Sequence, residues 1–325
     1  MAALPDEEFT ERAETHRREL RIHCYRLTGS FDEAEDLVQD TMLRAWRSRD
    51  QLSDDTKLRA WLYQIATNTC LDFLRRVDRR PRTYLPIPGM DHGDGIPPDF
   101  LEWLQPFPDH LLEPERPDEE AVARETIELV FLTAIQQLTP QQRAVFVFRE
   151  VLGWSAAATA AAMDMSVASV NSTLQRAKPR LRKNLPEDRS QWRTEGPTAE
   201  ERMVLDAYHA AAESADIEAI ADLLTSDVVL TMPPNPFWFT SRDAMLGFIE
   251  QSLDPNSSGY LGEWKHVSTM ANRMPAVAWY VRRPGTTIYR AQVLDVLRVE
   301  AGRVAQITSF EPHLFTAFAL PLVVH

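Results

Sequence analysis

Hydrophobic positions in the first 80 residues recur with a helical period. Between Phe31 and Trp46 the apolar residues are spaced by three and four, at Ala34, Leu37, Val38, Thr41, Met42 and Ala45. This spacing predicts a helix with one buried face, with Asp32 and Glu35 at capping-box distance near its start. A second helix is predicted from Thr56 to Arg80, with a buried stripe of Leu58, Trp61, Leu62, Ile65, Thr69 and Phe73. Tyr63 and Asn68 lie off this stripe and are expected at the surface.

A second helical pattern begins at Thr139. Thr139, Pro140 and Gln142 form a helix start in which the third residue reaches back to the cap. The expected buried stripe ends before Gly153 and comprises Ala144, Val145, Phe148, Val151 and Leu152.

Two shorter helices are predicted to follow. Ser155 opens an alanine-rich helix that runs to Met163, and the turn Asp164-Met165-Ser166 caps a further helix from Val167 to about Lys183. A short helix, a tight turn and a second helix are typical of the helix-turn-helix, whose last helix enters the major groove of DNA. Helical hairpins in protein cores can share this spacing.

The pattern changes again over residues 198–325. Helices are predicted at 201–213, 216–224 and 242–253, and strands at 228–232, 264–270, 276–282, 287–299 and 303–310. The last two strands are joined at Ala301-Gly302. Helices followed by a run of antiparallel strands predict an α+β cone.

Composition narrows the class of protein. The chain has 325 residues, a length typical of two or three domains, and only 11 glycines and two cysteines. It has no glycine-rich phosphate loop, which argues against Rossmann and P-loop enzymes, and too few cysteines for a disulfide framework or a four-cysteine zinc site. No apolar stretch approaches 18 residues and the start is acidic, so a cytoplasmic protein without a signal peptide is expected.

The net charge of −13 is unevenly distributed. Residues 83–125 carry −9 and many prolines, and are predicted to be a linker with an apolar island from Phe100 to Leu104. Residues 126–193 carry +4, and those after 193 carry −7. The excess of positive charge near the predicted recognition helix could neutralise phosphates, and comes from Arg176, Lys178, Arg180, Arg182, Lys183, Arg189 and Arg193.

Two long segments, in order, resemble the extracytoplasmic-function (ECF, group 4) sigma factors of the sigma-70 family. Residues 32–46 (DEAEDLVQDTMLRAW) and 60–76 (AWLYQIATNTCLDFLRR) are similar to region 2, and residues 138–178 are similar to region 4. The resemblance implies region 2 at 1–82, the linker at 83–125, region 4 at 126–190 and a fused domain at 198–325.

This resemblance implies RNA polymerase core, through its β′ and β subunits, and promoter DNA as partners, with no catalysis and no cofactor. An anti-sigma factor is compatible with the resemblance but is not required by it. The implied polymerase contacts are Asp32, Glu35, Asp36, Gln39 and Asp40. The implied contacts to the −10 promoter element are Arg59, Tyr63, Asn68, Arg75, Arg76 and Arg79. Those to the −35 element are Ser166, Ser169, Asn171, Ser172, Thr173, Gln175, Arg176 and Lys178.

The chain departs from the family at Asn171 and Thr173, where basic residues are common. Asparagine pairs with adenine edges and arginine with guanine, so a different base preference is expected.

The last block resembles the SnoaL-like polyketide-cyclase fold, which ketosteroid isomerases and nuclear transport factor 2 share. In a sigma factor it implies regulation in cis. The candidate pocket residues are Trp238, Trp264, Tyr280 and Asp295, with Tyr208 as a further wall and His209 and His266 as further polar candidates. The alternative is a ligand-binding or carbonyl-chemistry enzyme domain tethered to a DNA-binding module. An ordinary DNA-binding repressor is a third possibility.

Overall fold

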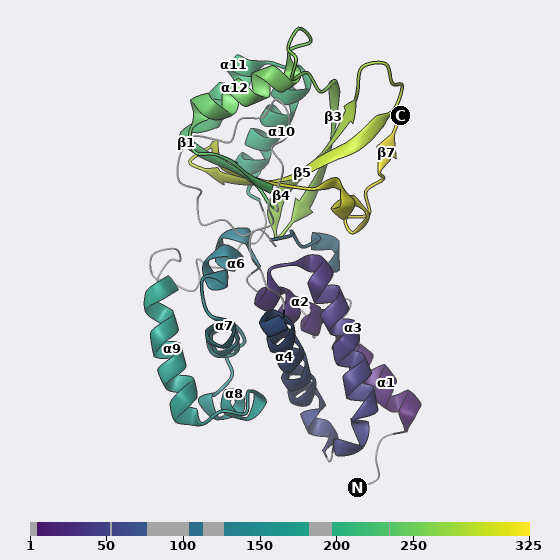
Figure 1. Cartoon of the computed structure of the whole chain (residues 1–325), viewed down its shortest axis with the longest axis vertical. Coiled ribbons are helices and arrows are strands. Elements are labelled where there is room, and N and C mark those ends of the chain that lie inside the picture. The colour runs from purple at the N-terminus through teal and green to yellow at the C-terminus, as the bar shows by residue number, and fades with distance from the viewer. Residues whose placement is uncertain (1–4, 53, 77–103, 113–126, 182–196, 234) are drawn as a thin grey trace. The chain divides into compact units, whose positions relative to one another are not determined.

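The computed structural model describes residues 5–52, 54–76, 104–112, 127–181, 197–233 and 235–325. These residues form two compact units. Unit 1 contains the described residues of 5–76 and 111–181, all of them helical or in connections, and unit 2 contains residues 104–110 and 197–325 (Figure 1).

Unit 1 begins with four helices: α1 (Asp6–Glu14), α2 (Arg17–Thr28), α3 (Phe31–Arg47) and α4 (Leu58–Arg76), with short 3₁₀ turns at Arg49–Gln51 and Asp55–Lys57. Gly29 ends α2 with a φ of +74°, a left-handed conformation that favours glycine. Helix α3 begins where the sequence predicts, but its cap is Ser30, whose hydroxyl accepts a hydrogen bond from the Glu33 N–H at 3.4 Å. Asp32 and Glu35 do not form the capping box, since Glu35 pairs with Arg21.

The buried face of α4 differs from the predicted stripe. Leu58, Leu62 and Thr69 are buried as expected, but the predicted core residues Trp61, Ile65 and Phe73 are only half-buried. The expectation that Tyr63 lies at the surface is wrong, because its side chain is only 1% exposed. The reason is that α4 contacts α2 and α3 on one side and α7 and α8 on another, so more than one of its faces is covered.

The second part of unit 1 contains α6 (Leu129–Gln136), α7 (Pro140–Phe146), a π-helical turn (Val147–Val151), α8 (Ala156–Ala162) and α9 (Val167–Leu181). The predicted caps are confirmed: Thr139 and Gln142 form a capping box, and Ser155 and Ser166 accept hydrogen bonds from the N–H groups of Ala158 and Ser169. Val151 and Leu152 are half-buried, not buried, because the wider π turn rotates them away from the α-helical stripe.

An aromatic cluster joins the two parts of unit 1. The ring of Tyr63 on α4 lies 4.9 Å from His23 on α2 and 5.4 Å from Trp154, and His23 lies 5.2 Å from Phe148. Burial lowers the pKa of His23 to about 3, so this ring is neutral at physiological pH. The aromatic contact between the two parts of unit 1 therefore resembles a protein core, because none of its rings carries a charge.

Unit 2 is an α+β cone. Its elements are α10 (Ala199–Glu213), α11 (Ile217–Leu223), β1 (Leu224–Met232), β2 (Asn235–Phe239), α12 (Arg242–Leu253), β3 (Glu263–Ala271), β4 (Met274–Arg282), β5 (Tyr289–Glu300), β6 (Arg303–Phe310), a 3₁₀ turn (Pro312–Thr316) and β7 (Val323–Val324). The strand order is β2-β1-β6-β5-β4-β3, with β7 on β5. The predicted run of antiparallel strands over 264–310 is confirmed as β3, β4, β5 and β6, and β1 adds a parallel pair with β6.

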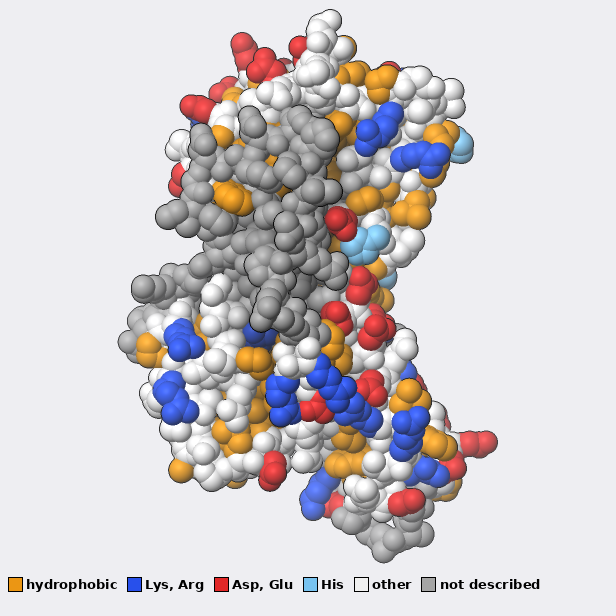
Figure 2. Space-filling model, viewed as in Figure 1, with side chains coloured by type: hydrophobic (Ala, Val, Ile, Leu, Met, Phe, Trp, Pro, Cys, Tyr) orange, Lys and Arg blue, Asp and Glu red, His pale blue; other side chains and the backbone are white. Residues whose placement is uncertain are grey.

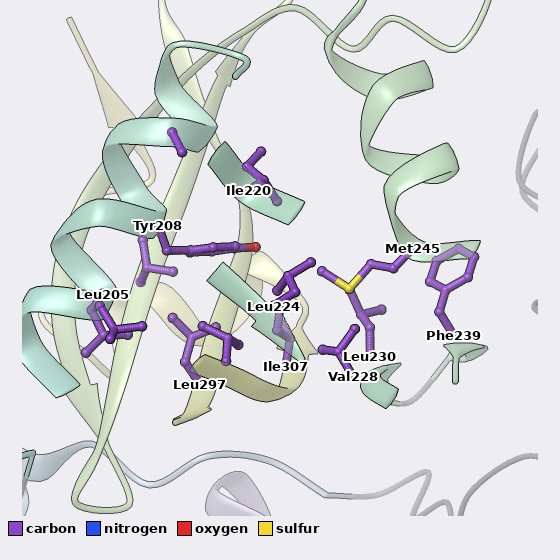
Figure 3. Packing of buried hydrophobic residues seen from close by; sticks show 14 of the residues in the cluster. Leu205, Tyr208, Ile220, Leu224, Val228, Leu230, Phe239, Met245, Leu297 and Ile307 are labelled. Atoms are coloured by element: carbon purple, nitrogen blue, oxygen red, sulfur yellow. The ribbon is translucent and has the colours of Figure 1, made fainter. Parts of the chain in front are cut away.

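The core of the cone lies between the three helices and one face of the sheet. Tyr208 of α10 extends its ring toward Ile220 and Leu224, and Leu230 packs near Met245 of α12 (Figure 3). The hairpin at Ala301-Gly302 is confirmed, with φ of +48° and +74° at the two turn residues.

A short segment of the interdomain connection packs on the cone. The Phe107 N–H donates to the Asn272 side-chain oxygen at 2.8 Å, and the Asn272 N–H donates to the Phe107 carbonyl at 2.9 Å. The Arg273 N–H donates to the Asp109 carboxylate at 2.8 Å. Asn272 and Arg273 form the two-residue turn between β3 and β4, both with positive φ. Of the predicted apolar island, Leu104 is buried, and 100–103 lie outside the described residues.

Candidate nucleic-acid and polymerase interfaces

Helix α9 presents a polar face. Its buried face consists of Val170, Thr173, Leu174, Ala177 and Leu181. The exposed side chains include six of the predicted −35 contacts: Ser166, Ser169, Asn171, Ser172, Gln175 and Arg176. The helix-turn-helix spacing therefore places these side chains on one accessible face.

Thr173 is a correction to the predicted contacts. It is 3% exposed, because it lies between Val170 and Leu174 on the core side of α9. Its hydroxyl accepts a hydrogen bond from the Arg176 guanidinium at 3.2 Å. Thr173 can thus orient Arg176 but is not itself placed to touch DNA.

All the charged side chains of α9 are basic. Residues 167–181 contain Arg176, Lys178 and Arg180 and no acidic residue. Lys178 forms a 3.2 Å ion pair with Glu150, and Arg180 donates to Gln142 at 3.2 Å, so both are held against α7 and the π turn that follows it. On the visible face of unit 1, several Lys and Arg side chains lie beside acidic ones and others are scattered singly (Figure 2).

The predicted −10 residues on α4 fall into two groups. Arg59 donates hydrogen bonds to both carboxylate oxygens of Glu19, at 2.6 to 3.1 Å, and its guanidinium lies 5.0 Å from the Tyr63 ring centre. The Tyr63 hydroxyl donates to Glu19 at 3.1 Å. Burial raises the pKa of Glu19, but hydrogen bonds from His16 and Arg59 outweigh it and leave the pKa below its usual value. Glu19 therefore stays ionised and holds Arg59 and Tyr63 in a structural network.

Further along α4 the predicted residues are accessible. Asn68, Arg75 and Arg76 are exposed, although Arg75 also pairs with Asp72 at 2.5 Å. Arg79 lies outside the described residues. The C-terminal half of α4 is thus the more open part of the predicted −10 surface.

The exposed face of α3 combines acidic and apolar groups. Asp32, Asp36 and Gln39 are exposed, whereas Glu35 and Asp40 are half-buried. Asp40 forms a 2.8 Å ion pair with Arg44 and Glu35 pairs with Arg21.

Two apolar residues extend the α3 face beyond the predicted set. Leu43 is 55% exposed and Trp46 is 44% exposed. The sequence contained a signal for this exposure, because neither residue belongs to the buried apolar stripe that begins at Ala34. Exposed tryptophan and neighbouring apolar side chains on one helix face are typical of a protein-binding surface.

The cone contains a cavity of about 140 Å³ between α10–α12 and the sheet, which is partly open to solvent. Of the predicted pocket residues, Trp264 and Asp295 line it and Tyr280 and Trp238 do not. Tyr280 points to the other face of the sheet, where its hydroxyl donates to the Pro321 carbonyl at 2.9 Å.

Neighbouring residues of a strand lie on alternate faces of the sheet. The residue of β4 that lines the cavity is therefore Trp279, which was not among the residues predicted from the sequence. Tyr208 lines the cavity as expected.

Asp295 is the acidic group of this cavity. Its carboxylate accepts hydrogen bonds from Trp279 Nε1 at 3.0 Å and from Ser309 Oγ at 2.5 Å. Burial raises the pKa of Asp295 to about 6, although the two hydrogen bonds oppose the shift. His266 instead pairs with Glu213 at 2.5 Å. Burial lowers the pKa of His209 to about 4, and neither histidine lines the cavity.

In the described ranges, no three His, Cys, Asp or Glu side chains are placed together as metal ligands. No helix in the part of the chain that the structure describes is long and apolar enough to cross a bilayer.

Comparison with known families places these surfaces in context. The family model of Sigma-70 region 2 matches residues 13–80, that of Sigma-70 region 4 matches 128–181, and that of the SnoaL-like domain matches 205–307. The ECF RNA polymerase sigma factor SigG of Mycobacterium tuberculosis is 38% identical over 318 residues, which cover 97% of this chain and 84% of that protein. The chain belongs to the ECF RNA polymerase sigma factors. It is an alternative sigma factor with a C-terminal SnoaL-like domain.

Other relatives fit this assignment. The ECF sigma factor SigL of M. tuberculosis is 31% identical over 188 residues, which cover 58% of this chain and 89% of that protein. The crystal structure of M. tuberculosis SigJ, also an ECF sigma factor, covers 97% of this chain and 99% of its own, with a TM-score of 0.61 and 22% identity. This likeness confirms the fold, in which helical sigma regions and an α+β domain share one chain.

Proposed function

We propose that this ECF sigma factor binds RNA polymerase core through the exposed face of α3 and promoter DNA through α9 and the C-terminal half of α4. The proposed domains are region 2 at 1–82, a linker at 83–125, region 4 at 126–190 and the SnoaL-like domain at 198–325. The observation that carries the proposal is the face of α9, which exposes small polar side chains and Arg176 and has no acidic residue. Such a face can enter a groove and hydrogen-bond to base edges.

The function can be tested with reconstituted holoenzyme. Core polymerase plus this chain is expected to start run-off transcription from promoters that the holoenzyme itself selects from random DNA. Binding to duplex DNA that core polymerase does not enhance would instead indicate an ordinary repressor. A chain that binds neither core polymerase nor any selected promoter contradicts the proposal.

Replacing Arg176 is expected to weaken promoter binding. The Arg176→Ala holoenzyme should bind its selected promoter roughly 10- to 100-fold more weakly, since one lost arginine contact to a base or phosphate costs about 1–3 kcal/mol. Thr173→Val should have a smaller effect in the same direction, because it removes only the acceptor that holds Arg176. Fluorescence anisotropy with promoter DNA measures both. Equal promoter affinity of the Arg176→Ala and parent holoenzymes would show that Arg176 on α9 does not contact the promoter and would contradict the proposed interface.

Replacing Trp46 is expected to weaken polymerase binding. Trp46→Ala should lower the affinity for core polymerase at least about tenfold, because exposed tryptophans at interfaces contribute about 2 kcal/mol or more. The stability of the free chain should change little, since Trp46 is 44% exposed. Met203→Ala, at another exposed apolar residue, on α10, is the matched control and should bind core polymerase normally. Unchanged affinity of Trp46→Ala would show that the partner uses another face.

The SnoaL-like domain is proposed to regulate the sigma regions in cis. Support comes from the segment Leu104–His110, which lies in sequence between regions 2 and 4 and is hydrogen-bonded to Asn272 and Arg273 of the cone. A domain that holds part of this linker limits the separations that the two DNA-binding regions can adopt.

Asn272→Gly tests this anchor. Glycine keeps the positive φ of the turn but removes the acceptor of the Phe107 N–H, so hydrogen exchange at Phe107 should rise about tenfold. Run-off transcription should change with it. The control Arg273→Gly alters the same turn but keeps the backbone N–H that binds Asp109. A freed segment with unchanged transcription would count against regulation in cis.

We further propose that the chain is not an enzyme. Asp295 is held by Trp279 and Ser309, and His266 is held by Glu213, so neither is arranged as an acid–base pair around the cavity. The observation that favours the alternative, carbonyl chemistry, is the raised pKa of Asp295. Turnover of a carbonyl substrate that Asp295→Ala abolishes would establish the alternative.

A further inference from the structure

The SnoaL-like domain contains a cavity with a single formal charge. Its walls are mostly apolar and come from helices and strands together, including Ile220, Leu230, Met245 and Phe248. The volume of about 140 Å³ is close to that of protein cavities of roughly 150 Å³ that take up benzene. The cavity is therefore large enough for one six-membered ring.

The charge in this cavity is uncompensated. Among the described residues that line it there is no Lys, Arg or His, and Asp295 is the one acid. Asp295 is 7% exposed, and its two partners, Trp279 and Ser309, are neutral. A buried carboxylate without a cationic partner is costly, so a ligand that brings positive charge gains more here than in water.

The wall around Asp295 is aromatic. The rings of Trp264 and Trp279 lie 6.1 Å apart at 85° to each other, and Tyr208 lies on the same cavity. Aromatic faces attract cations. Trp264 Nε1 is also buried and has no hydrogen-bond partner among the described residues, so it can donate to an oxygen of a ligand or to a water molecule that accompanies it.

We propose that this cavity binds a small amine: a one-ring molecule whose protonated nitrogen pairs with Asp295 and whose ring lies among Trp264, Trp279 and Phe248. Carboxylates and phosphates are excluded, because they would place a second negative charge beside Asp295. Neutral alcohols of the same size fit the walls but leave the carboxylate without a counter-charge. Amine binding is separate from binding to polymerase and DNA, and it can be measured without transcription.

Three probes of nearly equal shape separate these cases: benzylamine, benzyl alcohol and benzoate. Binding to the full chain is measured by tryptophan fluorescence and by ligand-observed NMR at pH 7.5. Benzylamine is expected to bind about tenfold more tightly than benzyl alcohol, because hydrogen bonds to a charged group are about twice as strong as neutral ones. Benzoate should bind most weakly.

Two variants and one control make the result specific. Asp295→Asn should lower the affinity for benzylamine to that for benzyl alcohol, and Ala212→Leu, which fills the cavity, should weaken both. Glu218→Gln removes an exposed acid of α11 and should change nothing. Benzoate binding as tightly as benzylamine, a preference for the amine that survives in Asp295→Asn, or no binding of any probe would each overturn the proposal.

Discussion

Replacing Arg143 with methionine should destabilise unit 1 by about 3–5 kcal/mol, far more than a substitution on the exposed faces of α3 or α9. Arg143 is 4% exposed, and its guanidinium donates to the carbonyls of Ile135, Gln136 and Leu138 at 3.1–3.2 Å and also to that of Leu27. Methionine fills a similar volume but removes the guanidinium donor of each carbonyl, and among the four the Ile135 carbonyl still accepts from the Leu138 N–H at 3.1 Å. Each unsatisfied buried group costs about 1–3 kcal/mol, and the costs are not fully additive.

The position of Arg143 explains why the effect should spread. Leu27 belongs to α2 in region 2, whereas Ile135, Gln136 and Leu138 belong to the end of α6 and the connection before α7 in region 4. One side chain therefore joins two segments more than 100 residues apart in sequence. Its loss should also loosen the aromatic contact of His23 and Tyr63 with Phe148.

Urea unfolding of the full chain tests the prediction, with hydrogen exchange of α2 and α7 peptides as the measure of unit 1. Arg176→Met is the matched control, because Arg176 is exposed on α9 and its replacement should cost less than about 0.5 kcal/mol. Equal midpoints for the two variants would show that the Arg143 hydrogen bonds contribute little.

The contribution of Asp295 to the stability of the cone should decrease as pH rises from 4 to 6. His209, whose pKa burial lowers to about 4, contributes in the opposite direction, so the comparison with Asp295→Asn isolates the Asp295 contribution. Burial raises the pKa of Asp295 from 3.8 to about 6, so between these values the folded domain holds a proton that the unfolded chain has released. Proton binding stabilises the state with the higher pKa, which here is the folded one. The contribution is therefore complete below pH 4 and is lost as pH rises through 6, a change of about 3 kcal/mol.

Asp295→Asn should remove this dependence. The variant is expected to be more stable than the parent at pH 8, and its advantage should shrink by about 3 kcal/mol between pH 8 and pH 4. The measurement is urea unfolding at each pH, followed by hydrogen exchange of β4 and β5 peptides. Glu218→Gln, an exposed acid, should follow the parent at every pH. A parent cone whose stability rises between pH 4 and 6 as much as that of the variant would refute the assignment.

Local signals in the sequence located most helices and their starts. Thr139, Ser155 and Ser166 cap the helices that they were expected to cap, because a cap is a hydrogen bond to a backbone N–H only two or three residues away. The Ala301-Gly302 hairpin was equally local. The cap of α3 was misassigned to Asp32 since two polar residues, Ser30 and Asp32, lie close together at the same helix start.

Non-local contacts account for the misplaced site residues. Tyr63 lies off the stripe of its own helix but is buried, because Phe148 and Trp154 from region 4 cover it. Thr173 was selected for its place in the recognition helix, yet it lies one residue from Leu174 on the core face. Trp279, rather than the predicted Tyr280, lines the cavity. The face on which a strand residue lies depends on the register, and a bulge interrupts the pairing of β4 with β5 between these two residues.

The sequence by itself determined the family, the order of the regions and the polar, acid-free face of the recognition helix, because each of these is written in neighbouring residues. Only the tertiary structure decided that Glu19 holds Arg59 and Tyr63, that Arg143 joins regions 2 and 4, and that the interdomain segment is fixed to Asn272. It also decided that Asp295 lies in an aromatic cavity whose described lining residues include no cationic side chain. These features depend on which distant segments pack together, and a hydrophobic pattern records only that a face is buried, not what buries it.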